Sequence, residues 1–351
     1  MTYQPKSYFI TNPDFTQFVN QMIKSKKVVA PVAKETQFVF APLEKFEDLR
    51  LDYDVTVLPP KKEFFPPAQV LLEFDGKGFK SVLHPEEKIL FGVHFYDIKA
   101  IDQLDILFAS GHPDENYLAH RRAATIVGSN IQKISPRAFW GSVGPEQSPK
   151  GHDAFLTKIN NGYVYEVFSP RGEVLTKLGQ FSSASDEQKM QAKQINEKIL
   201  NECPEKLPGT SAQIKEKVRN AFRNDALWEK LATDCFSCGS CNTTCSTCYC
   251  FDVQDHWNVD MSSGQRVRYW DSCLTEDFAK ISLGGGATEN FRHSRGSRFR
   301  HRMMRKFVYL NDKLGGPACV GCGRCSSSCT ANISDPVHVI QQIFDAEGGK
   351  S

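Results

Sequence analysis

Apolar positions in the front half of the chain follow the two periods that are typical of helices and of strands. After Asn12, Pro13 occupies a first helical position, and apolar residues at helical spacing predict a helix over Phe15–Ile23. A second helix is expected at Asp97–Phe108. Short apolar runs predict strands at Val28–Val32, Phe38–Ala41, Val70–Phe74, Lys88–Val93, Thr125–Gly128 and Tyr163–Phe168. Helices and strands mixed over about 180 residues indicate an α/β or α+β domain that buries a real core.

The pattern changes after this region. A loop-like stretch at Phe181–Gln188 precedes two moderate helices, and Pro204 and Pro208 separate them. We therefore expect three parts along the chain. These are an α/β scaffold or docking domain at residues 1–180, a helical linker at 181–232, and a mainly α-helical, ferredoxin-like dicluster domain at 233–351.

Composition and charge narrow the class of protein. The 351 residues carry 43 Lys and Arg against 41 Asp and Glu, and a net charge of +2 excludes a globally polycationic nucleic-acid binder. No apolar run approaches the roughly 20 residues that span a bilayer. The first residues also lack the apolar core of a signal peptide. We therefore expect a cytoplasmic protein without a membrane span.

The cysteines are distributed very unevenly. Residues 1–202 contain none of the 12 cysteines, and 11 of them lie between Cys235 and Cys329. A disulfide scaffold is typical of short secreted chains, so clustered thiols in a chain without a secretion signal indicate metal binding.

One spacing, C-x2-C-x2-C-x3-C, occurs twice in this region. A loop with a thiolate at every third residue can curl around a cubane and reach three of its irons. In two-cluster ferredoxins the fourth cysteine ligates the other cluster. The spacing predicts two [4Fe–4S] clusters with crossed ligand sets: Cys235, Cys238, Cys241 and Cys329 for one, and Cys319, Cys322, Cys325 and Cys245 for the other.

Structural zinc is the alternative, since C-x2-C pairs also form zinc ribbons. Zinc needs two pairs per ion and has no use for a third cysteine at the same spacing, so the cubanes are favoured. The proline that usually follows the fourth cysteine is replaced by Ser246 and Thr330. That proline ligates nothing, and the assignment does not depend on it.

The insert between the two motifs, residues 246–318, is far longer than a minimal ferredoxin needs. It holds Cys248, Cys250 and Cys273, which form a candidate third metal site if His256 or Asp252 supplies a fourth ligand. The alternative is that these cysteines are buried thiols near the clusters. Cys203 is expected to be a thiol in the core.

The insert ends in a basic run, Phe291–Leu310, with seven basic residues and no acidic one. Cations beside an anionic cluster stabilise its reduced form, and a cationic face can also dock a partner. A solvated helix face is the third interpretation. We favour docking through Arg295, Arg298 and Arg300, and we expect no nucleic-acid binding.

Catalytic motifs are missing from the sequence. It contains no G-x-x-x-x-G-K-[ST], G-x-G-x-x-G, H-E-x-x-H or G-x-S-x-G. No catalytic residue and no bound flavin are therefore expected in this chain.

Four segments of the rear half resemble the iron–sulfur beta subunit of sulfhydrogenase-type [NiFe] hydrogenases and, equally, the A subunit of anaerobic sulfite reductase. They are Cys235–Val253, Tyr269–Cys273, Arg302–Tyr309 and Cys319–Cys329. In the front half, Leu51–Pro67, Phe91–Asp105 and Gly151–Thr157 agree in order. The resemblance implies an electron-transfer subunit between a flavin-binding NAD(P)H or ferredoxin reductase-like subunit and a catalytic redox subunit. The catalytic subunit would be hydrogenase-, sulfite reductase- or heterodisulfide reductase-like.

The chain departs from this family in its front half. Family members often carry cysteines there, at positions that correspond here to Tyr96, Asn130, Ala138 and Trp140. A front-domain cluster is therefore not expected, and the front domain would serve as a scaffold or docking module. A rival hypothesis is that the front domain binds a flavin and carries the catalytic site itself. A second rival is a zinc-bound interaction protein without redox activity.

Overall fold

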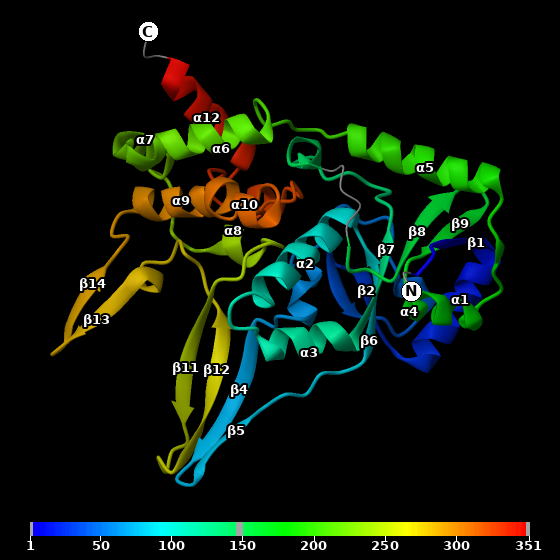
Figure 1. Ribbon diagram of the computed structural model, residues 1–351, viewed down its shortest axis with the longest axis horizontal. Coiled ribbons are helices and arrows are strands. Elements are labelled where there is room, and N and C mark those ends of the chain that lie inside the picture. Colours follow the sequence, from blue (N-terminus) through cyan, green and yellow to red (C-terminus); the bar gives the residue numbers. More distant parts are fainter. Residues whose placement is uncertain (1–2, 145–149, 349–351) are drawn as a thin grey trace. The chain divides into compact units, whose positions relative to one another are not determined.

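The computed structural model describes residues 3–144 and 150–348, which divide into two compact units (Figure 1). Unit 1 comprises Met1–Phe64, His84–Ser135 and Pro145–Cys203, and unit 2 comprises Phe65–Leu83, Pro136–Gly144 and Pro204–Ser351. Each unit is assembled from segments that are far apart in the sequence.

Unit 1 is built on an eight-stranded mixed sheet in the order β10-β1-β9-β8-β7-β6-β2-β3. Its centre is parallel, because β2 pairs with β6, β6 with β7, and β7 with β8 in the same direction. The flanking pairs are antiparallel. The strands are β1 (Lys6–Thr11), β2 (Lys27–Lys34), β3 (Gln37–Pro42), β6 (Lys88–Val93), β7 (Ala124–Ser129), β8 (Ala154–Ile159), β9 (Gly162–Val167) and β10 (Ser182–Ser183).

The described residues of this unit form the α-helices α1 (Asn12–Ser25), α2 (Phe95–Phe108), α3 (Glu115–Ala123), α4 (Pro170–Leu175) and α5 (Asp186–Asn201). The side chain of Thr11 caps α1 by accepting from the Asp14 amide, so the helix begins at Asn12. The apolar stripe of α1 enters the same core cluster as residues of β6, β8 and β9. The helical spacing seen in the sequence is thus the face of α1 that packs on the sheet.

Both helices and all six strands expected in the front half are present, within a few residues of their expected bounds. The agreement follows from burial, which favours apolar residues at most positions of β6 and on one stripe of α1. One of the expected strands, β4 (Ala68–Asp75), belongs to unit 2.

Unit 2 contains a four-stranded antiparallel sheet in the order β11-β12-β4-β5. Strands β5 (Gly78–Ser81), β11 (Phe251–Trp257) and β12 (Ser263–Trp270) complete it. In Figure 1, β4 in blue lies beside β12 in yellow, although the two strands are almost 190 residues apart in sequence. A separate hairpin joins β13 (Lys280–Gly284) to β14 (Ala287–Asn290), and Gly284, Gly285 and Gly286 form its turn with positive φ angles.

The helices of unit 2 are α6 (Ser211–Asn220), α7 (Asp225–Leu231), α8 (Ser240–Thr243), α9 (Arg295–Met304), α10 (Asn311–Leu314), α11 (Arg324–Ser327) and α12 (Pro336–Gly348). A π-helical turn at Arg305–Tyr309 continues α9. Short 3-10 turns lie at Phe46–Asp48, Pro60–Glu63, Trp140–Ser142, Thr176–Leu178, Ala221–Arg223 and Asp277–Ala279.

The expectation of a mainly helical rear domain is not confirmed, since unit 2 combines these helices with six strands in the described residues. The sequence did not reveal β11, β13 and β14, because most of their side chains are exposed and lack the alternation of a half-buried strand. Two segments from the first 180 residues also group with the rear motifs. β4 pairs with β12, and the Phe139 amide donates to the Gly321 carbonyl at 2.8 Å.

Candidate metal centre

The two cysteine motifs fold into the same loop. At equivalent positions Ser237 and Gly321 have φ angles of 57° and 67°, and Gly239 and Gly323 have φ angles of 77° and 78°. Each loop then enters a four-residue helix, α8 or α11. Repeated left-handed residues curl the chain tightly, which is the shape that lets closely spaced thiols face one point.

The loop of the second motif is covered by the segment Pro136–Gly144. A Cβ atom on Gly321 would lie 2.4 Å from the Trp140 amide nitrogen, and one on Gly323 would lie 2.5 Å from the Arg137 carbonyl oxygen. Trp140 and Ala138, two positions where family members often carry cysteine, are fully buried here. Tyr96 and Asn130, the other two positions, are buried in unit 1.

One cavity of unit 2 joins cysteines from both motifs. Its wall contains Cys235, Cys238 and Cys241 of the first motif together with Cys329 of the second. The cavity encloses about 370 Å³ of atom-free space, part of it open to solvent, and apolar side chains such as Phe299 complete its wall. The structure thus brings together the four residues of the first predicted ligand set.

The thiols of the second predicted ligand set lie close enough to shift one another's pKa. Burial raises the pKa of the Cys319 thiol to about 12, and the neighbouring Cys325 and Cys245 add to this rise. Burial also raises the pKa of Cys325, which lies near Cys245 and Cys241. Cys245, the last cysteine of the first motif, therefore lies among the thiols of the second motif. Buried thiols that ligate iron lose their protons to the metal, so their surroundings must stabilise negative charge.

Two buried cations provide that stabilisation. Burial alone would lower the pKa of Arg302, but the thiols of Cys241, Cys325 and Cys245 raise it above its usual value. Burial would likewise lower the pKa of Lys306, whereas Cys245, Cys248 and Cys319 raise it. The Lys306 amine donates to the Cys245 sulfur at 3.2 Å and to Thr247 Oγ1 at 2.6 Å.

These surroundings fit an anionic, all-thiolate iron–sulfur cluster. Buried Arg and Lys side chains are costly unless an anion lies beside them, and thiolates are the anions within reach. A single metal ion fits less well, because nowhere in residues 3–144 and 150–348 do three or more His, Cys, Asp or Glu side chains surround one ion position. A cubane is larger than one ion and holds its ligands farther apart.

The basic run Phe291–Leu310 contains α9 and the π-helical turn after it, and three of its seven Lys and Arg side chains, Arg298, Arg302 and Lys306, are buried. Arg298 is 4 % exposed and donates to the carbonyls of Arg292 and His293, while Arg300 pairs with Asp225. Arg302 and Lys306 lie four residues apart and interact with cysteines of both motifs. Only the spacing of these two cations within a run that lacks acidic residues could have identified them from the sequence.

The third group of cysteines lines a separate cavity of about 380 Å³ of atom-free space. Cys248, Cys250 and Cys273 share it with Asn242 and His301. The fourth ligands suggested by the sequence are elsewhere: Asp252 and His256 lie on the exposed strand β11, and His256 faces the Tyr269 hydroxyl at 3.1 Å. Cys203, expected in the core, is half-buried.

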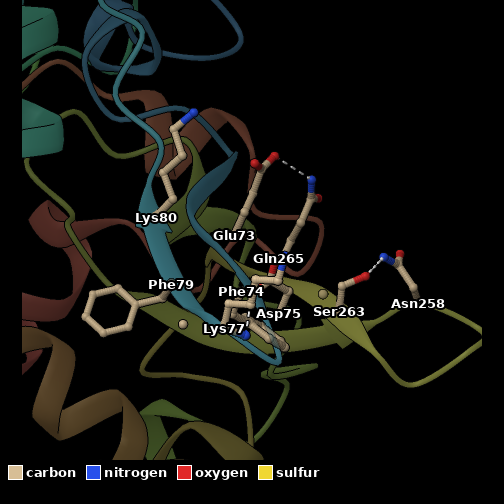
Figure 2. Close-up of a pocket in the computed structure, with 11 residues that line it drawn as sticks. Glu73, Phe74, Asp75, Lys77, Phe79, Lys80, Asn258, Ser263 and Gln265 are labelled. Carbon is tan, nitrogen blue, oxygen red and sulfur yellow. Dashed lines mark hydrogen bonds between the residues drawn. The ribbon is translucent and has the colours of Figure 1, made fainter.

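A larger cavity, with about 990 Å³ of atom-free space that is partly open to solvent, lies between the β4–β5 turn and the β11–β12 turn (Figure 2). Figure 2 shows Gln265 donating to Glu73 and Asn258 donating to Ser263 in its wall. No thiol lines it. Its chemistry is that of a polar groove and not of a redox centre.

In the part of the chain that the structure describes, no helix has both the length and the apolar character that crossing a bilayer requires.

Comparisons with known proteins agree with this geometry. The family model of a 4Fe-4S dicluster domain matches residues 234–333, which contain all eight cysteines of the two motifs. Sulfhydrogenase 2 subunit beta of Pyrococcus furiosus is 31 % identical over 331 residues, which cover 94 % of this chain and 96 % of that protein. No solved structure matches the chain significantly. With its 4Fe-4S domain and its similarity over nearly the whole length, the chain belongs to the iron–sulfur family of sulfhydrogenase beta subunits and is an electron-transport component of an oxidoreductase.

Proposed function

We propose that this chain holds two [4Fe–4S] clusters and relays electrons between two other subunits of an oxidoreductase complex. Cys235, Cys238, Cys241 and Cys329 would hold the first cluster, and Cys319, Cys322, Cys325 and Cys245 the second. The observation that carries the proposal is the cavity whose wall combines three cysteines of one motif with the last cysteine of the other. This grouping is the one that crossed ligation, as in two-cluster ferredoxins, requires.

The clusters, when bound, supply one-electron chemistry, and the chain's own residues set the conditions for it. Lys306 donates to the Cys245 sulfur and stabilises its negative charge. Arg302 interacts with thiols of both ligand sets and donates to Asn242 Oδ1 at 3.1 Å, which fixes its guanidinium. Buried positive charge favours the more negative, reduced form of a cluster, so these two side chains would raise the potentials of the clusters.

The partners follow from the family. The Pyrococcus relative is named as one subunit of a sulfhydrogenase. We propose that this chain likewise lies between a flavin-binding NAD(P)H or ferredoxin reductase-like subunit and a catalytic redox subunit of the hydrogenase, sulfite reductase or heterodisulfide reductase kind. Twelve free cysteines are typical of a reducing compartment, and the cytoplasm is the location that we propose.

Metal analysis of anaerobically prepared protein tests the proposal. Two cubanes correspond to about eight iron and eight acid-labile sulfide per chain. Zinc without sulfide would reject the clusters and favour a structural metal site. The partners are tested separately, by identifying the subunits that co-purify from native extract under anaerobic conditions.

A further inference from the structure

Three thiols outside the two cluster motifs form a connected group in the structure. Cys250 is hydrogen-bonded to both Cys248 and Cys273, so it lies between them. All three are free thiols that line one cavity. Cys248 and Cys273 are 7 % and 4 % exposed, and Cys250 is half-buried.

The backbone holds Cys250 and Cys273 together independently of any metal. Phe251 pairs with Trp270 at the base of the β11–β12 hairpin, and the Asp271 amide donates to the Cys250 carbonyl at 3.1 Å. Cys250 and Cys273 therefore extend from the two ends of a hydrogen-bonded hairpin. Two cysteines so placed can approach each other without rearrangement of the strands.

The side chains around the pair favour a thiolate at Cys273. Asn242 Nδ2 donates to the Cys273 sulfur at 3.2 Å, and the guanidinium of Arg302 lies nearby. The hydrogen bond from Cys250 lowers the pKa of Cys273 despite its burial. For Cys250, the hydrogen bond with Cys248 lowers the pKa, but the bond to Cys273 and burial outweigh it and raise the pKa to about 11. The thiol of Cys273 thus loses its proton more readily than the thiol of Cys250.

A third metal ion explains this arrangement less well. The three thiols and His301 line the same cavity, yet neither they nor any other His, Cys, Asp or Glu side chains of the described ranges are grouped around one ion position. The cations beside the thiols, Arg302, Arg305 and Lys306, favour thiolates.

We propose that Cys250 and Cys273 form a redox-active dithiol that switches between two thiols and a disulfide next to the candidate clusters. Reduction of the disulfide breaks the S–S bond, takes up two electrons and two protons, and leaves two thiols. The electrons come singly from a low-potential one-electron donor of the iron–sulfur class, and oxidation returns them singly to an acceptor of the same class. The chain then stores an electron pair where its clusters carry only single electrons.

Coulometric titration of the oxidised, cluster-loaded protein under anaerobic conditions tests this directly. Two clusters accept about two electrons per chain, and the disulfide adds about two more. We expect Cys250→Ser and Cys273→Ser each to take up about two electrons fewer than the unmodified chain. Cys203→Ser is the matched control, since it removes a half-buried thiol from unit 1 and should leave the uptake unchanged.

Mass spectrometry identifies the bond itself. Trypsin cleaves after Arg266 and Arg268, so a Cys250–Cys273 disulfide would join two separate peptides in the oxidised protein. After reduction, both cysteines should carry an alkylating label. Equal electron uptake by the chain and its serine variants, or two free thiols in the oxidised protein, would overturn the dithiol.

Iron content distinguishes the dithiol from a third iron–sulfur cluster. About twelve iron per chain, falling to about eight in Cys250→Ser, would show a third cluster instead and would also overturn the proposal. The dithiol rests on the proposed function in one respect only, namely that the iron–sulfur clusters exchange single electrons with it. The difference in uptake between the chain and its variants measures the dithiol whatever the number of clusters proves to be.

Discussion

The hydroxyl of Thr244 lies 3.0 Å from the hydroxyl of Ser328, and each residue directly precedes the fourth cysteine of its motif. The two short helices α8 and α11, which end at these positions, contact each other. The repeated loops are therefore joined at equivalent points. From this junction Cys329 reaches the cavity of the first motif, and Cys245 lies among the thiols of the second.

The crossing of ligands gives the first prediction. Cys329→Ser should alter the electron paramagnetic resonance signal of the same cluster as Cys238→Ser, because both side chains line one cavity. Cys322→Ser should alter the other signal. If Cys329→Ser and Cys322→Ser change the same signal, each motif holds its own cluster and the crossed assignment is wrong.

The second prediction concerns the buried amine of Lys306. Lys306→Met removes a positive charge 3.2 Å from the Cys245 sulfur and should lower the potential of the second cluster, since the reduced form is the more negative one. A unit charge about 4 Å away contributes about 4 kcal/mol at an effective dielectric constant near 20. The shift is therefore on the order of 200 mV for one electron and is measurable in a redox titration.

Two further variants serve as controls for this redox titration. Lys306→Arg retains the charge and should restore most of the potential. Arg295→Ala removes an exposed charge of the same basic run and should leave both potentials unchanged. A normal potential in Lys306→Met would mean that other groups compensate the Cys245 charge.

The third prediction uses two glycines with the same backbone conformation. Gly321 and Gly315 both have φ of 67°, but a Cβ atom would lie 2.4 Å from the Trp140 nitrogen at Gly321, whereas nothing lies within 4 Å at Gly315. Gly315→Ala should cost only the strain of a positive φ, about 1 kcal/mol. Gly321→Ala adds a backbone clash and should reduce loading of the second cluster.

Iron content measures the loading of the second cluster. The midpoint of urea unfolding, monitored by the visible absorbance of the clusters, measures the loss of stability. Equal behaviour of the two variants would mean that the segment Pro136–Gly144 does not press on the second loop.

The fourth prediction separates a structural from a docking role in the basic run. Arg298 donates to the Arg292 and His293 carbonyls and to Ser237 Oγ in the loop of the first motif. Arg298→Ala should therefore destabilise this loop by about 1–3 kcal/mol, because partly buried carbonyls lose their donor. Urea denaturation monitored at the first cluster measures the loss.

Arg295→Ala is the matched control for Arg298→Ala, because Arg295 belongs to the same basic run but is exposed. Arg295→Ala should change stability by less than about 0.5 kcal/mol. Weakened assembly with the partner subunits at low salt would identify it as a docking residue, whereas an unchanged complex would exclude the docking role that the sequence suggested for it.

Much of unit 1 was predictable because buried elements leave a regular pattern. The apolar run of β6 and the stripe of α1 follow directly from their burial. Apart from β4, the strands of unit 2 were not predicted from the sequence; β11 and β13, for example, are exposed along their whole length. The burial of individual charges in the basic run was not predictable from the sequence either, because composition does not tell which side chains point inward.

By itself, the sequence determined the chemistry of the centre: the thiols occur at the spacing that a cubane requires, and this spacing is local along the chain. The tertiary structure decided what lies around them. Lys306 reaches Cys245 from 61 residues away, Trp140 covers a loop 181 residues later in the chain, and Cys250 meets Cys273 only because β11 and β12 pair. Such contacts depend on how distant segments pack, and packing partners are not encoded in the spacing of any single motif.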